Sequence, residues 1–148
     1  MPYVEAFVLE VLRYSSMIPL GAVHRTTEDV EFHGFRIPKG TRVYANVWAV
    51  HFEPSIWGDP ENFRPERFLS PDELSVQKNE NLIPFSTGKR ACIAINFTFD
   101  QLFLFVACIV QRFDVWRKPG EPIPTLDPRI GQTVLTPHTY SVRMTERK

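Results

Sequence analysis

Proline is the feature that most limits what this chain can fold into. The sequence of 148 residues contains 13 prolines, about 9% against a usual value of about 5%, and ten of them lie between Pro38 and Pro128. Because proline fixes φ and has no backbone N–H to donate, it is disfavoured inside helices and central strands. Much of the chain is therefore predicted to be irregular coil joined to short elements.

Charge and cysteine content exclude several classes of protein. The 17 Lys and Arg residues balance 17 Asp and Glu residues, which argues against nucleic acid as a partner. Cys92 and Cys108 form no disulfide framework and no CxxC or CxxH pattern typical of structural zinc. The longest apolar run, Leu102 to Val110, is shorter than the roughly 20 residues of a membrane-spanning helix, and the N-terminus lacks the basic segment of a signal peptide. We expect one domain, residues 1–148.

The sequence predicts helices at four places. Residues 2–15 show helical spacing, with Pro2 suited to a first turn, and residues 46–52 suffice for one or two turns. The segment Ser70-Pro71-Asp72-Glu73 has the form of a capping box and predicts the start of a short surface helix. Residues 93–111 are apolar on nearly every side of the helical wheel, so this helix is expected to be buried inside something larger.

Two small antiparallel sheets complete the expected fold. Short β-type segments alternate with turns from Val23 to Val47, and similar segments follow between Phe113 and Thr145. Residues 54–73 are dense in proline and aromatic residues and are predicted to be packed coil. The chain is therefore expected to be α+β, with one buried helix between two small sheets.

Glu10 and Arg13 lie three residues apart on the first predicted helix and hence on one face. Such pairs are usually solvated and add little stability, but apolar neighbours on this helix leave a buried pair as the alternative. In that case Arg67, from the segment FRPERF, would be a third member. A buried Glu-Arg-Arg cluster would fix how the coil docks on the helix, since arginine presents a rigid fork of donors.

The segment Phe85-Ser86-Thr87-Gly88-Lys89-Arg90-Ala91-Cys92 directly precedes the long apolar helix. Gly88 permits a turn with positive φ and Arg90 carries a permanent cation. Cys92 stands at or just before the helix N-terminus, where amide donors and the helix dipole favour a thiolate. A thiolate held in a tight loop suits an axial ligand of haem iron. The alternative is a small buried side chain, which is also the expectation for Cys108.

These residues resemble the motifs of the cytochrome P-450 family. FSTGKRAC is similar to the family's haem-binding loop, Phe-x-x-Gly-x-Arg-x-Cys, and Glu10-Val11-Leu12-Arg13 resembles its Glu-x-x-Arg helix. Pro65-Glu66-Arg67-Phe68 is similar to its coil motif, and the three motifs occur in the family's order. The connecting segment FRIPKGTRVYANVWAVHFEPSIWGDPENFRPERF looks most like microsomal eukaryotic members. The resemblance covers essentially the whole chain, but only the C-terminal portion of the mostly α-helical family fold.

The resemblance implies a role for each residue of the cysteine loop. Cys92 would be the proximal thiolate ligand of haem b, iron protoporphyrin IX, and Arg90 would pair with a haem propionate. Phe85 would pack near the sulfur, and Gly88 would allow the turn of the loop. His24 matches the position of a second propionate donor, with an ordinary surface histidine as the alternative.

The remaining motif residues are implied to act on structure and on substrate. Glu10, Arg13 and Arg67 would form a structural triad that contributes to assembly and haem retention. Met17 to Val23 and Gln132 to Leu135 fall where the family lines its substrate pocket, with ordinary core and strand residues as the alternative. The pocket candidates are Ile18, Leu20, Val23 and Val134.

The chain also departs from the family pattern. The helix that activates oxygen precedes the Glu-x-x-Arg helix in the family, and it is missing here, as are the membrane anchor and the distal roof. Ala94 stands where the family usually has glycine, and residues 95–101 differ from the usual sequence of the helix. Haem ligation remains chemically possible because Gly88, Arg90 and Cys92 are all present.

The resemblance implies a monooxygenase in a complete protein. It would use dioxygen and electrons from an NADPH-cytochrome reductase, docked near Lys89 and Arg90, to oxidise a small apolar organic substrate at the endoplasmic reticulum membrane. The alternative is a truncated, non-catalytic fragment that does not bind haem stably by itself, since its apolar helix would expose a large surface. A small haem-carrying or redox-sensing module is a third interpretation. Whether the chain alone is an enzyme is left open by the sequence.

Overall fold

The computed structural model describes residues 1–147, and helices occupy its central part. The long helices are α1 and α4, which the hydrophobic spacing predicts, and the remaining helical elements are one or two turns long. In chain order the helices are α1 (Pro2–Ser15), α2 (Val47–His51), α3 (Pro54–Trp57), the 3₁₀ helices η1 (Pro65–Phe68) and η2 (Gly88–Arg90), and α4 (Ile95–Arg112).

The strands form short antiparallel pairs. The pairs are β1 (His24–Arg25) with β4 (Arg42–Val43), β2 (Val30–Phe32) with β3 (Phe35–Ile37), β5 (Phe113–Arg117) with β8 (Val142–Glu146), and β6 (Arg129–Ile130) with β7 (Leu135–Thr136). Each of the two expected sheets is thus divided in two. The first is interrupted by Pro38 and the turn at Gly40, whose φ is 84°, and the second by the proline-rich residues 119–128.

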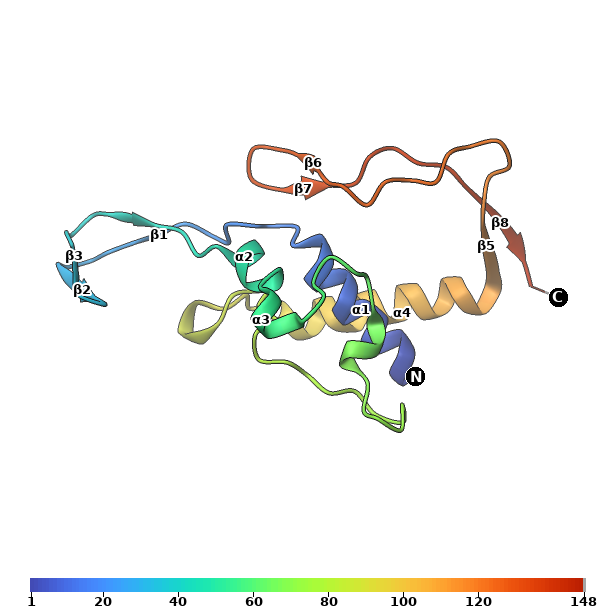
Figure 1. Ribbon diagram of the computed structural model, residues 1–148, viewed down its shortest axis with the longest axis horizontal. Helices are drawn as coiled ribbons and strands as arrows, with labels where there is room; N and C mark the ends of the chain where they lie inside the picture. Colours follow the sequence, from blue (N-terminus) through green and yellow to red (C-terminus); the bar gives the residue numbers. More distant parts are fainter. Residues whose placement is uncertain (148) are drawn as a thin grey trace.

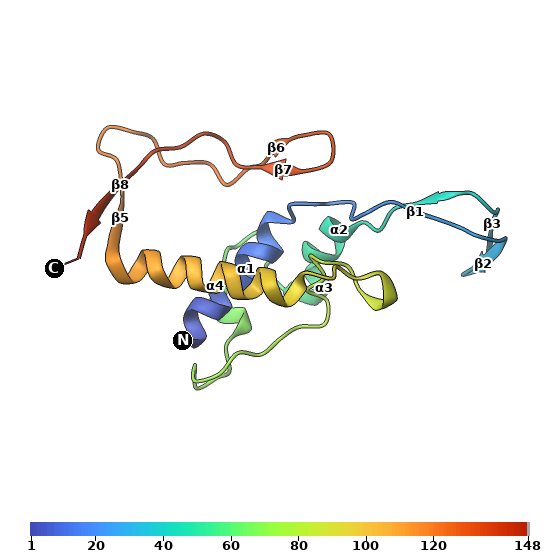
Figure 2. The same cartoon turned by 180° about the vertical axis from the view of Figure 1, so that it is seen from behind.

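The helices lie at the centre and the strand pairs extend from them. α1 packs against both η1 and α4, and both views show α4 crossing α1 (Figures 1 and 2). The β2–β3 hairpin projects from one end of the molecule, and the β5–β8 pair lies at the other end (Figure 1). The mixture of helices and small antiparallel sheets agrees with the α+β expectation.

The core forms where α1 meets the proline-rich segment. Its buried members are Ala6, Leu9, Trp57, Phe68 and Leu69. The segment predicted to be coil therefore supplies three of the five, although it is not entirely irregular. Pro54–Trp57 forms the helical turn α3, which begins because the Glu53 carboxylate accepts the N–H of Ser55 and because proline suits a first helical position.

No helix begins at Ser70, so the capping-box prediction is wrong. The Ser70 hydroxyl accepts the N–H of Ser75 at 3.0 Å, and the Asp72 carboxylate accepts the N–H of Leu74 at 3.1 Å. Glu73 has a φ of 57°, which is left-handed and incompatible with an α-helix. Serine and aspartate side chains offer the backbone local partners that compete with helical hydrogen bonds, and here they close a turn instead.

The helix predicted over residues 93–111 is present as α4, and within this chain it is exposed, as expected for the apolar helix of a chain that forms part of something larger. It contains no buried residue, and Phe97 and Phe105 are each 67% exposed. Cys108 is also exposed, so its expected role as a small buried side chain is wrong. The described chain covers α4 mainly where α1 packs against it. Within residues 1–147, no helix is both long and apolar enough to cross a membrane.

Candidate functional site

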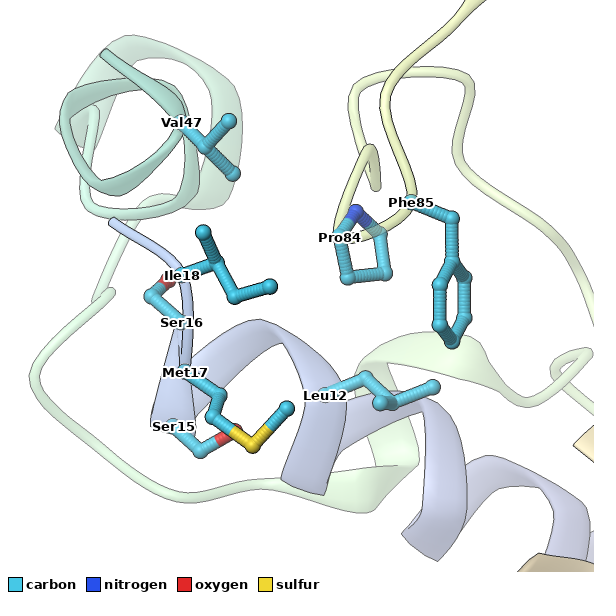
Figure 3. A pocket seen from close by; sticks show the side chains of 8 residues that line it. All are labelled: Leu12, Ser15, Ser16, Met17, Ile18, Val47, Pro84 and Phe85. Atoms are coloured by element: carbon cyan, nitrogen blue, oxygen red, sulfur yellow. The ribbon is translucent and has the colours of Figure 1, made fainter. Parts of the chain in front are cut away.

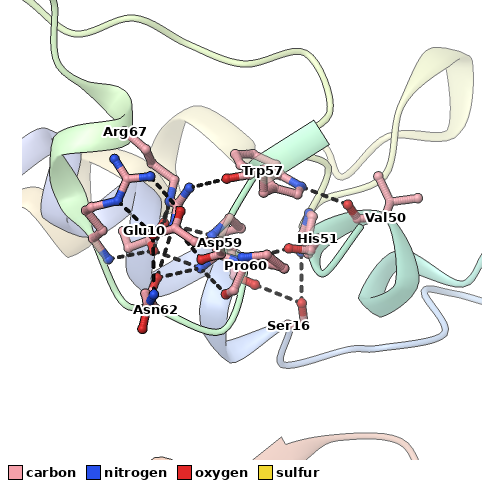
Figure 4. A network of polar contacts seen from close by, with 11 residues as sticks. Glu10, Ser16, Val50, His51, Trp57, Asp59, Pro60, Asn62 and Arg67 are labelled. Carbon is pink, nitrogen blue, oxygen red and sulfur yellow. Dashed lines mark hydrogen bonds and ion pairs between the residues drawn. The ribbon is translucent and has the colours of Figure 1, made fainter. Parts of the chain in front are cut away.

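Glu10 and Arg13 form a buried ion pair on α1. Both side chains are 0% exposed. The Arg13 Nε donates to Glu10 Oε2 and its Nη2 to Oε1, each at 2.8 Å, so the pair is bidentate. Figure 4 shows Glu10 within the network of polar contacts that also includes Asp59 and Arg67. The expectation of a solvated surface pair is wrong, and the buried alternative is correct. The reason is tertiary, because this face of α1 is covered by η1 and the preceding coil.

Arg67 joins the pair from η1. Its Nε lies 3.1 Å from Glu10 Oε2, and its side chain is only 6% exposed. The other donors of the guanidinium reach backbone carbonyls: Nη1 donates to the Trp57 carbonyl at 2.9 Å and Nη2 to the Asn62 carbonyl at 3.0 Å. The structure therefore brings together Glu10, Arg13 and Arg67, as the motif spacing predicts. We refer to these three residues as the Glu-Arg-Arg cluster.

The cluster holds the irregular segment against α1 through its backbone. Arg13 Nη1 donates to the His51 carbonyl at 2.8 Å, and its Nη2 donates to the Pro60 carbonyl at 2.9 Å. The N–H of Arg64 donates to Glu10 Oε1 at 2.8 Å. Buried backbone polar groups outside helices and sheets need partners, and two arginine forks supply them here.

Asp59 extends the cluster towards the surface, and sequence reasoning missed it. Its Oδ1 lies 2.6 Å from Arg64 Nη2 and 3.3 Å from Arg67 Nη2. The hydrogen bond from the Arg64 guanidinium is the main cause that holds the pKa of the Asp59 carboxyl well below its usual range. Asp59 is therefore ionised at neutral pH and balances one of the two arginines that approach it.

His51, the last residue of α2, is a second residue that sequence reasoning missed. Its side chain is fully buried. The ring Nδ1 lies 2.8 Å from Ser16 Oγ, and the ring Nε2 accepts the N–H of Ile83 at 3.0 Å. Burial, with the nearby Arg13 cation as a second cause, lowers the pKa of His51 from 6.5 to about 4. A lone histidine on a five-residue helix gives no periodic signal, so only the tertiary contacts reveal it.

The depressed pKa of His51 predicts a pH dependence of stability. Between about pH 6.5 and 4 the unfolded chain protonates this histidine while the folded chain keeps it neutral. The free energy of unfolding should therefore fall by on the order of 3 kcal/mol over this range and level off below it. Urea unfolding of the wild type and of His51→Gln at several pH values measures the difference. Parallel pH curves for the two proteins would contradict the prediction.

The cysteine loop, residues 85–92, closes on itself through its backbone. The Cys92 N–H donates to the Phe85 carbonyl at 2.9 Å, and the Ala91 N–H donates to the Gly88 carbonyl at 3.1 Å. Gly88 has a φ of 71°, a conformation that glycine adopts without steric cost. α4 begins at Ile95, so Cys92 precedes the helix by three residues and does not lie at its cap.

The side chains of the cysteine loop are open to a large ligand. The Cys92 thiol is exposed, as are Lys89 and Arg90. Arg90 has no ion-pair partner within residues 1–147. Phe85 is half-buried, and its ring meets that of Phe99 edge to face with centroids 5.5 Å apart. These groups fit a flat metal complex that carries carboxylates, since the sulfur is a metal ligand, the Arg90 guanidinium donates to carboxylates and the Phe85 ring offers an apolar surface.

His24 lies away from this loop in sequence, on β1, and it is exposed. It lines an open cavity of about 410 Å³ together with Val23, Arg25 and Arg42. Arg25 and Arg42 are direct cross-strand partners of β1 and β4. The side chains around His24 are therefore cationic, which suits an anionic group.

A smaller cavity of about 60 Å³ lies between the end of α1, α2 and the cysteine loop (Figure 3). Ile18 and Phe85, singled out for different roles, both line it. The tail reaches the same segment, since the Leu135 N–H donates to the Met17 carbonyl at 2.8 Å. Among the other pocket candidates, Leu20 and Val23 are exposed and Val134 is half-buried. The cavity is lined by Leu12, Ser15, Ser16, Met17, Ile18, Val47, Pro84 and Phe85.

Known proteins resemble this chain over nearly its entire length. Cytochrome P450 1A2 of Oryctolagus cuniculus is 40% identical over 99% of the chain and 29% of its own length. Cytochrome P450 2U1 of Mus musculus is 41% identical over 99% of the chain and 27% of its own length. Cytochrome P450 18a1 of Drosophila melanogaster is 39% identical, again over 99% of the chain and 27% of its own length. The chain thus spans less than a third of these relatives.

The family model described as Cytochrome P450 matches residues 1–144. This range contains the Glu-Arg-Arg cluster, the cysteine loop and the α-helices α1, α2, α3 and α4. The motif resemblance, the match to the family model and the identity to these relatives agree, and the chain belongs to the cytochrome P450 family.

Proposed function

We propose that residues 1–148 are the C-terminal, haem-binding part of a haem-thiolate monooxygenase. The observation that carries the proposal is the cysteine loop, which presents the exposed Cys92 thiol beside the exposed Arg90 and ties its own ends through the Cys92 N–H and the Phe85 carbonyl. Membership of the cytochrome P450 family supports the same reading.

Each site residue then has a defined task. Cys92 would hold haem iron as a thiolate, and Arg90 and His24 would bind the propionates. Phe85 would pack beside the sulfur, and Gly88 would let the loop turn tightly. The Glu-Arg-Arg cluster would hold the proline-rich segment on α1 and so preserve the shape of the site. The cluster itself would take no part in the reaction. When bound, thiolate-ligated haem supplies the reductive activation of dioxygen that permits oxygen insertion into an apolar substrate.

The partners of the complete protein follow from the same surfaces. Lys89 and Arg90 are exposed at the cysteine loop and would form a cationic docking face for an acidic surface of an NADPH-cytochrome reductase. Ile18, Leu20, Val23 and Val134 would contribute to the wall of a pocket for a small apolar organic substrate. The resemblance of the connecting segment to microsomal members of the family supports the endoplasmic reticulum membrane as its location.

Replacement of the proposed ligand tests this function. Haem would be added to the complete protein that contains residues 1–148. Three forms would be compared: the wild type, Cys92→Ser and the matched control Cys108→Ser. Only a thiolate ligand shifts the Soret band of the reduced, CO-bound form strongly to the red. The wild type and Cys108→Ser should show this band, and Cys92→Ser should lose it. An unchanged band in Cys92→Ser would refute Cys92 as the ligand.

The exposure of α4 supports a second interpretation of the chain taken by itself. Ile93 before the helix is 99% exposed, and Phe97 and Phe105 on it are each 67% exposed. A surface of this kind is typical of a chain that needs further protein around it. We therefore also propose that residues 1–148, when isolated, form a non-catalytic fragment that does not hold haem stably. Haem titration of the isolated chain tests this, and stable uptake with a red-shifted Soret band would refute it.

A further inference from the structure

The buried contacts of His51 connect two parts of the molecule that the motifs treat separately. Its backbone carbonyl accepts from Arg13 in the Glu-Arg-Arg cluster at 2.8 Å. Its ring accepts the N–H of Ile83, two residues before Phe85, at 3.0 Å. Resting on the function proposed above, we propose that His51 is a positioning residue that holds the cysteine loop in register with the Glu-Arg-Arg cluster.

The hydrogen bonds assign one tautomer to His51. A backbone N–H only donates, so Nε2, which meets the Ile83 N–H, must be an unprotonated acceptor. The proton of the neutral ring therefore lies on Nδ1 and is donated to Ser16 Oγ at 2.8 Å (Figure 4). The Ser16 hydroxyl in turn donates to the Arg13 carbonyl at 2.9 Å. Every polar atom of the ring is used, and the ring is fixed in orientation.

The link continues from Ile83 into the cysteine loop. The Ile83 carbonyl accepts the N–H of Ser86 at 3.0 Å, and the Phe85 carbonyl accepts the N–H of Cys92 at 2.9 Å. Pro84 and Phe85 line the small cavity whose opposite wall includes Ser16 (Figure 3). A continuous path of hydrogen bonds and chain thus leads from Arg13 through His51 and Ile83 to the Cys92 amide.

Two substitutions separate the two arms of the His51 ring. The amide of glutamine reaches the position of Nε2, so His51→Gln keeps an acceptor for the Ile83 N–H and loses the bond to Ser16. The shorter amide of asparagine reaches the position of Nδ1, so His51→Asn keeps the bond to Ser16 and loses the link to Ile83. His33→Asn serves as the control, because His33 is exposed at the tip of the β2–β3 hairpin.

Amide hydrogen exchange of the complete, haem-free chain measures the link directly. In His51→Asn the Ile83 amide should exchange about ten-fold faster than in the wild type, and the Cys92 amide should also exchange faster. In His51→Gln and His33→Asn both amides should stay close to wild-type rates. The amide of Leu9, in the middle of α1, reports on the stability of the fold as a whole and should change much less than Ile83 in His51→Asn.

Three results would overturn the proposal. They are an unprotected Ile83 amide in the wild type, an unchanged Ile83 rate in His51→Asn, and an equal acceleration at Ile83 and Leu9 in both His51 variants. The last result would mean that His51 only stabilises the fold. Because these readouts need no haem, they fail or succeed independently of the Soret band that tests Cys92 as a ligand.

Discussion

Replacing Glu10 by alanine should lower the free energy of unfolding by about 3–5 kcal/mol. The carboxylate lies between two guanidinium groups, with contacts of 2.8 Å to Arg13 and 3.1 Å to Arg67. Its removal leaves the buried Arg13 cation without a counter-charge, leaves Arg67 with Asp59 alone at 3.3 Å, and leaves the Arg64 N–H without its acceptor. Because natural domains are stable by only about 5–15 kcal/mol, the proline-rich segment should detach from α1. Urea unfolding followed by circular dichroism measures the change.

The matched control for Glu10→Ala is Asp29→Ala. Asp29 also forms an ion pair, with Arg36 at 2.7 Å, but the two side chains are 49% and 80% exposed. Exposed pairs add little to stability because water and salt screen them. Asp29→Ala should therefore leave the urea midpoint almost unchanged. Similar shifts for the two variants would show that the Glu-Arg-Arg cluster is as replaceable as a surface pair.

Phe68→Ala should also cost about 3–5 kcal/mol, through a different mechanism. Phe68 is fully buried in the core with Ala6, Leu9 and Trp57, and its ring lies 5.8 Å from that of Trp57. Truncation removes apolar contacts and leaves a cavity between η1 and α1. Since the neighbouring Arg67 depends on the placement of η1, the variant should also loosen the Glu-Arg-Arg cluster. Thermal unfolding monitored by circular dichroism measures the loss of stability.

Phe35→Ala is the control for the loss of an aromatic side chain. Phe35 is 72% exposed at the end of the β2–β3 hairpin, so its truncation creates no cavity, and a change within about 0.5 kcal/mol is expected. A loss for Phe35→Ala as large as for Phe68→Ala would contradict the placement of the core at the junction of α1 and η1.

The sequence alone was sufficient where the signal is local. Helical spacing predicts residues 2–15, the range that α1 occupies. The pair at Glu10 and Arg13 and the later Arg67 are visible as spaced residue types, and the Phe-x-x-Gly-x-Arg-x-Cys pattern singles out the loop that closes at Cys92. These features depend on side-chain periodicity and on the conformational range of glycine, which act over a few residues.

Local sequence patterns are not sufficient where the same residues suit both a helix and a turn, or where the outcome depends on the rest of the fold. The segment at Ser70 has the residues of a capping box, yet the same serine and aspartate close a turn. The helix from Ile95 is apolar all round and was expected to be buried only inside something larger, and in this chain it is exposed. A pattern along one helix contains no information on whether partners are present.

What the sequence by itself determined is the presence of α1, the α+β character and the family motifs of the Glu-x-x-Arg helix and the cysteine loop. Only the tertiary structure decided that Glu10 and Arg13 are buried, that His51 and Asp59 belong to their network, and that the His51 ring bonds to Ile83. The physical reason is the separation along the chain of the residues that interact. Helix spacing and turn chemistry act between near neighbours in the chain, whereas burial and the hydrogen bonds of His51 join residues more than thirty positions apart and exist only after the chain has folded.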